Sequence, residues 1–400
     1  MNPAWRATAF SAALFLLVGA NLPYLPVWLE QARGFSGTEI SAIAAAGMLL
    51  RVFAGPLAAA RAETTGLARA LLQMSMVLVL AYAIVIPQSP KAIIATAIVL
   101  ASIAWGTLMP LVETLLLTTT KDTRPDYGTA RSISSAAFIL TSLALGVLIG
   151  RMGEEVIIYW MAGVSVLMAA LGLTLPKAAP AEQAPLSLVQ SMRQGFGLYR
   201  NPRILLAGLA SSFIQAAHAY YYNLGSNVWL GQGIAEEHIG ALWSIGVALE
   251  VVLLLVSGWL FRSWSAGAIM LLGGMGALIR WTITGFAPSL EVLYAAQALH
   301  ALSFAATHIG YMQFLRTEIV PEKIGTVISI SSAVGYGPML AIFGLLTGYW
   351  YDTFDTAQAQ GFWLMAASAF VGCLCLLPLF GEGSPLSSRP RPSGRRAGTQ

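Results

Sequence analysis

Long runs of apolar residues, separated by short polar segments, recur along the whole chain. Each run holds about eighteen residues or more, and a helix of that length crosses a hydrocarbon core roughly 30 Å thick. A segment in lipid must satisfy its own backbone hydrogen bonds, and the ten-residue alternation of a membrane barrel is absent from the sequence, so helices are predicted. The predicted spans are 7–29, 38–60, 67–87, 92–118, 127–150, 155–175, 204–229, 237–261, 267–287, 289–315, 323–350 and 358–380.

The longest polar connection lies in the middle of the chain and divides it into two halves. It contains four prolines, and its residues 186–199 are predicted to form a short amphipathic surface helix. We therefore expect a six-helix bundle over 1–175, a cytoplasmic linker over 176–203, a second six-helix bundle over 204–380 and a disordered cytoplasmic tail over 381–400. The first run lacks a clear small-x-small cleavage site, so we interpret it as an uncleaved first helix.

Composition agrees with this pattern, because 57% of the residues are hydrophobic, only 10% are charged and the mean hydropathy is +0.70. A soluble domain is about 25% charged, so a soluble protein is excluded. The net charge of +4 is explained by topology and needs no nucleic-acid partner. If the N-terminus is inside, sixteen basic residues fall in inner loops and the tail, against three in outer loops, Arg33, Lys91 and Arg151. This bias predicts that both termini face the cytoplasm.

Ionisable residues also occur inside the predicted spans. An ionisable side chain at membrane depth costs about 2.5 kcal/mol or more on insertion scales, so each is a functional candidate. The simpler alternative is that they form structural ion pairs, but their spread over many spans favours a function. They are Arg51, Glu113, Arg131, His218, Glu250, Arg280, His300 and His308.

Depth along the helices predicts which of these groups meet. Glu113 and Arg131 lie at similar depths, about 12 Å and 9 Å from the inner ends of consecutive antiparallel spans, so they are expected to pair. Arg280 and His300 occupy adjacent spans, and His308 lies about 12 Å along the helix from His300 and about 80° around it. We expect these three groups to line one cavity with Glu250.

Four short segments have distinctive sequences: DYGTAR at 126–131, QAAHAYYY at 215–222, LWSIGVALE at 242–250 and LIRW at 278–281. Together with His300, these segments resemble the 3-phenylpropionate permease group of the major facilitator superfamily. The resemblance runs from the first span to the twelfth. It implies two six-helix bundles that rock around a central site, in the inner membrane of a bacterium.

That group is similar to the sugar–proton symporters of the lactose permease type, which implies roles for five residues. Glu113 and Arg131 match an acid and an arginine that grip substrate, including their eighteen-residue separation. Glu250, Arg280 and His300 match an acid, an arginine and a histidine that serve substrate recognition and coupling.

The chain departs from that pattern in two places. The sugar permeases have a proton-carrying glutamate three residues after the histidine, where this chain has Ser303. Proton carriage is therefore expected to pass to Glu250, His300 or His308. The superfamily's loop signature after the second span is degenerate, because GPLAAAR at 55–61 has no aspartate.

The resemblance implies proton-coupled symport of a small organic acid, such as a phenylpropionate, by alternating access. The proton gradient supplies the energy, and neither a cofactor nor a metal is expected. Three buried arginines against two buried acids leave a positive surplus that suits a carboxylate. The predicted substrate-binding residues are Arg51, Glu113, Arg131, His218, Tyr221 and Asn223, and the predicted proton-coupling residues are Glu250, Arg280, His300 and His308.

Other functions stay open at this point. A proton-coupled sugar or nucleoside symporter, or a proton-antiport exporter, would use the same groups differently. A membrane-embedded enzyme is not predicted, because the sequence has no intramembrane nucleophile motif and no metal-spaced histidine pair. A transporter-like sensor would normally need an output domain. The expected partners are a small organic anion and the lipid bilayer, with no nucleic acid, and the expected state is a monomer.

Overall fold

The computed structural model describes residues 2–121, 123–176 and 197–380, and the regular structure in these ranges is helical. The first half contains α1 (Pro3–Val27), the π-helical turn η1 (Trp28–Ala32), α2 (Gly37–Thr65), α3 (Leu67–Val85), α4 (Lys91–Thr119), α5 (Tyr127–Met152) and α6 (Glu155–Thr174). The second half contains α8 (Pro202–Ala216), α9 (Ala219–Gly231), α10 (Glu236–Leu260), α11 (Ala266–Gly285), α12 (Leu290–Ala298), η2 (Ala301–Ala306), α13 (Thr307–Glu318), α14 (Pro321–Ile330), η3 (Ser331–Tyr336), α15 (Gly337–Thr353), η4 (Asp355–Gln360), α16 (Gly361–Leu376) and η5 (Leu377–Phe380).

The predicted all-helical membrane fold is confirmed. Nine helical segments in the described ranges are long and apolar enough to cross a membrane. The remaining predicted spans, 204–229, 289–315 and 323–350, are also helical, but each is built from shorter pieces. Most of the predicted linker (177–196) and the predicted tail lie outside the described residues.

The span over 204–229 breaks between α8 and α9 because His218 uses a backbone acceptor that the helix needs. Both the backbone N–H and the ring Nδ1 of His218 bond the carbonyl oxygen of Gln215, at 3.2 Å and 3.0 Å. That oxygen would otherwise accept from residue 219 in a continuous helix. In the first turn of α9, the N–H of Tyr220 donates to the sulfur of Met365, 3.4 Å away.

The other two interrupted spans each contain a π-helical turn. In the eleventh span, η3 leads directly into Pro338, near the start of α15. Proline has no N–H, and its ring would clash with the carbonyl four residues earlier, so a wider turn relieves the clash. In the tenth span, η2 carries Ser303. Such turns often occur at functional sites.

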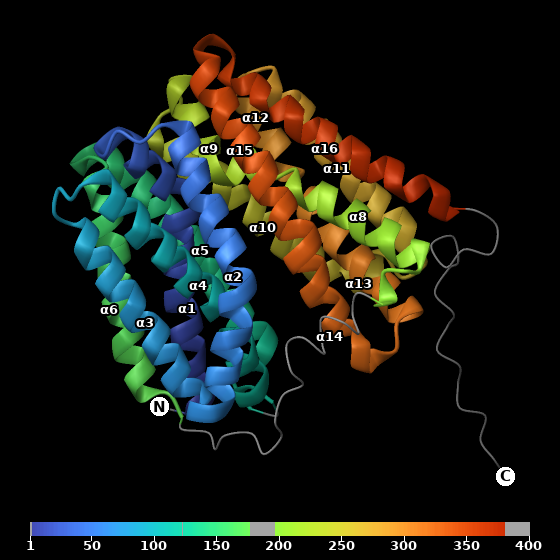
Figure 1. Ribbon diagram of the computed structural model, residues 1–400, viewed down its shortest axis with the longest axis horizontal. Coiled ribbons are helices and arrows are strands. Elements are labelled where there is room, and N and C mark those ends of the chain that lie inside the picture. Colours follow the sequence, from blue (N-terminus) through green and yellow to red (C-terminus); the bar gives the residue numbers. More distant parts are fainter. Residues whose placement is uncertain (1, 122, 177–196, 381–400) are drawn as a thin grey trace.

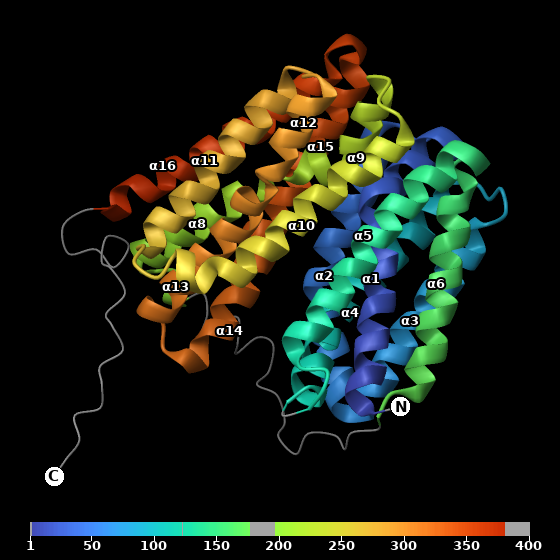
Figure 2. The ribbon, with the colours of Figure 1, turned by 180° about the vertical axis from the view of Figure 1, so that it is seen from behind.

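The helices form two groups that converge at one end and diverge at the other, as an inverted V in Figures 1 and 2. One group holds α1 to α6 and the other α8 to α16. The main contacts between the groups are those of α2 with α15 and of α5 with α10. The N-terminus lies at the diverging end (Figure 1). Gly37, at the start of the second span, is therefore at the converging end.

Glycines allow the close approach of the two groups at the converging end. A Cβ atom built on Gly348 of α15 would lie 2.6 Å from the carbonyl oxygen of Gly37 on α2. One built on Gly240 of α10 would collide with the carbonyl oxygen of Ser142 on α5. Any larger residue at either glycine would push the groups apart.

Polar contacts join the two groups at the same end. The Asp352 carboxylate of α15 accepts hydrogen bonds from the backbone N–H groups of Gly37 (2.7 Å) and Thr38 (2.8 Å), at the N-terminus of α2. A negative charge is favourable there because the helix dipole is positive at that end. In addition, the Glu30 carboxylate accepts from the Tyr351 hydroxyl (2.8 Å) and from the side-chain amide of Asn227 (2.5 Å).

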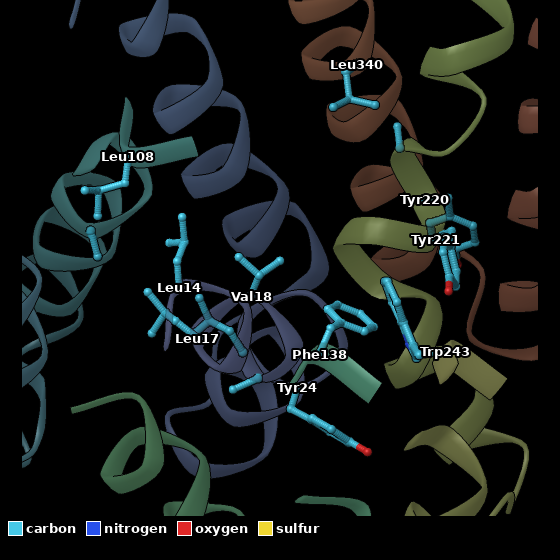
Figure 3. Packing of buried hydrophobic residues seen from close by; sticks show 14 of the residues in the cluster. Leu14, Leu17, Val18, Tyr24, Leu108, Phe138, Tyr220, Tyr221, Trp243 and Leu340 are labelled. Atoms are coloured by element: carbon cyan, nitrogen blue, oxygen red, sulfur yellow. The ribbon is translucent and has the colours of Figure 1, made fainter. Parts of the chain in front are cut away.

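Large apolar side chains cover the outside of the helices, as expected for contact with lipid. Leu173 and Leu255, for example, are each 74% exposed. The interior of the first group is built around α1, whose Leu14, Leu17 and Val18 are buried (Figure 3). Charged residues at membrane depth therefore have three environments available: this apolar exterior, the interior of one helix group, or the space between the groups.

Candidate functional site

Glu113 of α4 and Arg131 of α5 form an ion pair, as their depths predicted. The Arg131 Nη1 atom lies 3.6 Å from a Glu113 carboxylate oxygen, and the guanidinium also lies 4.9 Å from the centre of the Phe15 ring. Each side chain is about one third exposed (35% and 37%). A charged pair exposed to lipid would be costly, so these groups face the space between the helix groups.

Tyr127 completes this first cluster. Its hydroxyl donates a hydrogen bond to Glu113. The DYGTAR segment places it there, because the Asp126 side chain accepts from the N–H of Thr129 (2.8 Å) and begins α5 at Tyr127. Hydrogen bonds from Thr129 hold the pKa of the Asp126 carboxyl below its ordinary value. Tyr127 and Arg131 are four residues apart and therefore share one helix face.

Arg280 of α11 is fully buried in the second helix group, and among the described residues its direct partners are neutral. Its Nη1 atom donates to Ser303 Oγ (3.2 Å) and lies 2.9 Å from His300 Nδ1, while Nη2 donates to the Gln297 side chain (2.5 Å). The guanidinium carbon lies 4.0 Å from the ring centre of Trp281, in cation–π geometry.

His300 connects Arg280 to Glu250. An arginine can only donate, so His300 Nδ1 accepts and the ring proton of the neutral form resides on Nε2. Nε2 points at a carboxylate oxygen of Glu250, 3.5 Å away. The charge of Arg131, from the other helix group, is close enough to act on Glu250. Charged residues from both halves thus form one continuous arrangement at membrane depth.

His218 and Tyr221 are both buried, and they pack against the side chains around Arg280 and His300. His218 Nδ1 bonds the carbonyl oxygen of Gln215, and Nε2, the other ring nitrogen, lies 3.0 Å from the Ser303 hydroxyl. Tyr221 stacks on Trp243 with ring centres 4.0 Å apart (Figure 3), and the Arg280 guanidinium lies 4.7 Å from the centre of its ring. Both residues therefore help to position Ser303 and Arg280 from the interior of the second helix group, and they are not exposed themselves.

Three predicted site residues lie apart from this cluster. Arg51 of α2 lies over the ring of Trp105, at 5.2 Å from its centre. Asn223 of α9 packs against Gly344 of α15, where an added Cβ would lie 2.6 Å from its amide nitrogen. His308 is exposed on α13, where the charge of Glu250 acts on it. The structure brings Arg280, His300 and Glu250 together, and in the described residues His308 has no direct contact with them.

Four contacting residues were not predicted as site residues: Tyr127, Trp243, Gln297 and Ser303. Helical spacing holds a signal for all of them. Tyr127 is four residues before Arg131, Trp243 is seven before Glu250, and Gln297 and Ser303 flank His300 at a distance of three. Polar or aromatic residues at these spacings from an intramembrane charge share its face.

A family model, described as the MFS_1 like family, matches residues 5–362. The chain belongs to the MFS_1 like family. Among curated proteins, the probable 3-phenylpropionic acid transporter of Escherichia coli K12 is 27% identical over 91% of this chain and 94% of its own length. The maltose permease of Geobacillus stearothermophilus is 25% identical over 94% of each chain.

Solved structures agree with the fold of this family. The crystal structure of the nucleoside transporter NupG superposes with a TM-score of 0.80 at 18% identity, and covers 95% of this chain and 99% of that one. A proton-dependent oligopeptide transporter gives a TM-score of 0.72 at 12% identity, over 94% and 96% of the two chains. The fold is therefore the predicted major facilitator fold.

Membership of the MFS_1 like family confirms several expectations from the sequence. The protein is a multi-pass membrane transporter with a small-molecule substrate, and the relatives reported above are transporters and not enzymes. The predicted resemblance to the phenylpropionate permeases is confirmed by the relative from Escherichia coli.

Proposed function

We propose that this protein carries a small organic acid together with protons across the bacterial inner membrane by alternating access. The observation that carries the proposal is the arrangement of charges from both helix groups. The Glu113–Arg131 pair belongs to the first group, the Glu250–His300–Arg280 chain to the second, and the charge of Arg131 acts on Glu250 between them. A substrate or proton that changes one charge therefore changes the attraction between the groups.

The substrate class is supported by the balance of charge and by one relative. Three intramembrane arginines stand against two glutamates, so an anion is needed for neutrality. A carboxylate matches the planar fork of an arginine. The similarity to a probable 3-phenylpropionic acid transporter favours a carboxylic acid with an aromatic group.

The geometry favours Glu250 as the proton carrier. His300 Nδ1 is occupied by a bond from Arg280, so a second ring proton would break that bond and place two positive charges side by side. His218 already uses Nδ1 on a carbonyl oxygen and Nε2 on Ser303. Glu250 has a partly exposed side chain, and one of its carboxylate oxygens lies 3.5 Å from His300 Nε2. Its protonation would weaken its attraction for Arg131.

The excess of basic residues in the predicted inner loops supports a cytoplasmic N-terminus. With that orientation the converging end is outside, and the present arrangement is the inward-facing one. Opening to the outside would require the contacts of Gly37, Glu30 and Asp352 across the groups to break.

Binding to a ligand panel tests the substrate class. The purified protein is heated with 3-phenylpropionate, maltose or a nucleoside, and its melting temperature is recorded across pH. We expect 3-phenylpropionate to raise the melting temperature, because a ligand that binds only the folded state stabilises it. No shift with any carboxylate, together with a shift by maltose or the nucleoside, would overturn the proposal.

Proton-coupled sugar symport is the second candidate, and one observation favours it. The maltose permease of Geobacillus stearothermophilus is 25% identical over nearly the whole chain. In that case Glu113 and Glu250 would accept hydrogen bonds from sugar hydroxyls. The same ligand panel separates the two candidates, and counterflow with a pH jump separates import from export.

A further inference from the structure

Arg51 is an intramembrane arginine whose guanidinium has no oxygen acceptor in the described part of the chain. Its Nη2 atom lies 2.8 Å from the thioether sulfur of Met48. Its Nε atom is buried and has no hydrogen-bond partner. A thioether is a weak acceptor, whereas a guanidinium has five N–H donors. A charge left unpaired at membrane depth is costly, and it marks a place where a partner is expected to bind.

The other intramembrane charges are already engaged. Arg131 pairs with Glu113, and Arg280 donates to the side chains of Gln297 and Ser303. Glu250 is the partner of His300. Arg51 differs from these two arginines because its guanidinium contacts no oxygen acceptor in the described part of the chain.

The surroundings of Arg51 fit an aromatic anion. The guanidinium carbon lies 5.2 Å from the centre of the Trp105 ring. The next residue, Gly106, leaves room for the arginine, because an added Cβ there would lie 2.5 Å from Nη1. Tyr336 of η3 belongs to the other helix group and precedes Gly337, where an added Cβ would lie 3.9 Å from the Met48 sulfur that Arg51 contacts. The Tyr336 hydroxyl is close enough to interact with the Arg51 charge. Arg51, Trp105 and Tyr336 are all partly exposed, so a ligand can reach them.

We propose that Arg51, Trp105 and Tyr336 form a subsite for the carboxylate and ring of an aromatic carboxylic acid. The guanidinium binds the carboxylate through its fork, and the Trp105 ring packs on the aromatic group. Tyr336 belongs to the other half of the protein, so a bound acid touches both helix groups. The inference rests on the proposed function and deepens it, since it assigns carboxylate recognition to Arg51 and not to Arg131 or Arg280.

The test compares two ligands that differ only in charge, 3-phenylpropionate and its amide, by titration calorimetry of the purified full-length protein. We expect the wild type to bind the acid at least about tenfold more tightly than the amide. Arg51→Gln should remove this preference by weakening only the acid. Arg61→Gln is the matched control, because it removes an exposed arginine from the same helix, and it should keep the preference.

Gly106→Ala is a second variant that leaves the charge in place. The added methyl group displaces the guanidinium from its position beside Trp105, so the preference for the acid should again fall. This variant decides the matter if Arg51→Gln does not fold.

Each outcome has one meaning. Loss of the preference in Arg51→Gln or Gly106→Ala, with Arg61→Gln unchanged, supports the subsite. An unchanged preference in folded Arg51→Gln overturns the inference and leaves the proposed function standing. A wild type that binds no carboxylate overturns both.

Discussion

At the residue scale, the function depends on which partner each intramembrane charge has. Arg131 pairs with the carboxylate of Glu113, and its charge also acts on Glu250 of the other helix group. Arg280 contacts no carboxylate directly within the part of the chain that the structure describes, and it is held by Gln297 and Ser303. The two arginines are therefore suited to different tasks. Arg131 can respond to a change of charge on Glu113 or Glu250, whereas the neutral partners of Arg280 hold it in a fixed environment.

Arg131→Ala should abolish uptake of 3-phenylpropionate, with a loss of at least about tenfold, while the protein stays folded. Without Arg131, Glu113 loses the partner of its ion pair and Glu250 loses a positive charge that acts on it, and a tenfold loss of uptake corresponds to about 1.4 kcal/mol. The measurement is uptake into vesicles at matched protein levels, with Arg151→Ala as an exposed control. Normal uptake by the Arg131 variant would refute its role.

Ser303→Ala should destabilise the cluster formed by His218, Arg280, His300 and Ser303. The Ser303 hydroxyl is buried and contacts both His218 and Arg280, so its loss leaves two polar groups short of a partner. A cost of about 1–3 kcal/mol is expected for such groups, seen as a lower melting temperature. Ser257→Ala, which removes a hydroxyl bonded only within its own exposed helix turn, should melt like the wild type. Equal melting of both variants would contradict the assigned contacts.

Much of the cluster could be predicted from residue spacing, and part of it could not. The Glu113–Arg131 pair follows from depth on two antiparallel helices. Spacing gives Gln297 and Ser303 as neighbours of His300 on one helix face, but it does not show that they contact Arg280 on another helix, and η2 changes the angular relation between His300 and the residues after it. The spacing that placed His308 in the same cavity assumed a regular α-helix, which the chain does not form there.

At the element scale, the interrupted helices are concentrated around the cluster. The break at His218, the turn η2 with Ser303 and the turn η3 before Pro338 all belong to the second half. Hydropathy predicts that a segment crosses the membrane but not that it stays regular. A polar side chain such as His218 competes for backbone acceptors, and proline removes a donor, so both effects depend on local chemistry.

The start of α5 gives an element-scale prediction. Asp126 accepts from the N–H of Thr129 and fixes the first turn, on which Tyr127 and Arg131 are carried. Asp126→Ala should lower uptake severalfold and reduce the melting temperature, because the first turn frays. Asp126→Ser should restore most of both properties, since serine is also a good cap. A serine variant as impaired as the alanine variant would show that capping is not the role of Asp126.

At the scale of the whole molecule, the two halves are held together at one end by few groups. The Asp352 carboxylate lies on the N-terminus of α2, and Glu30 is bound by Tyr351 and Asn227. The two-bundle plan was predictable from the six-plus-six pattern of spans. These cross-group contacts were not, because they join residues more than 190 positions apart whose contact depends on the conformation.

Asp352→Asn should shift the protein toward the conformation that is open at this end. The neutral amide offers one oxygen to two backbone donors and loses the interaction with the helix dipole. Spin labels at positions 88 and 232, both exposed at this end, should show a larger population at long distance. Asp355→Asn, an exposed acid nearby, should leave the distribution unchanged. An unchanged distribution in the Asp352 variant would contradict its role in holding this end closed.

The central claim is that the charges shared by the two halves couple an organic acid to protons. The most direct measurement is accumulation of labelled 3-phenylpropionate in proteoliposomes with an imposed inward proton gradient. We expect accumulation above equilibrium that collapses when a protonophore is added. Glu250→Gln should lose this accumulation but retain exchange of internal and external substrate. Accumulation that a protonophore does not change, or that persists undiminished in Glu250→Gln, would contradict the account.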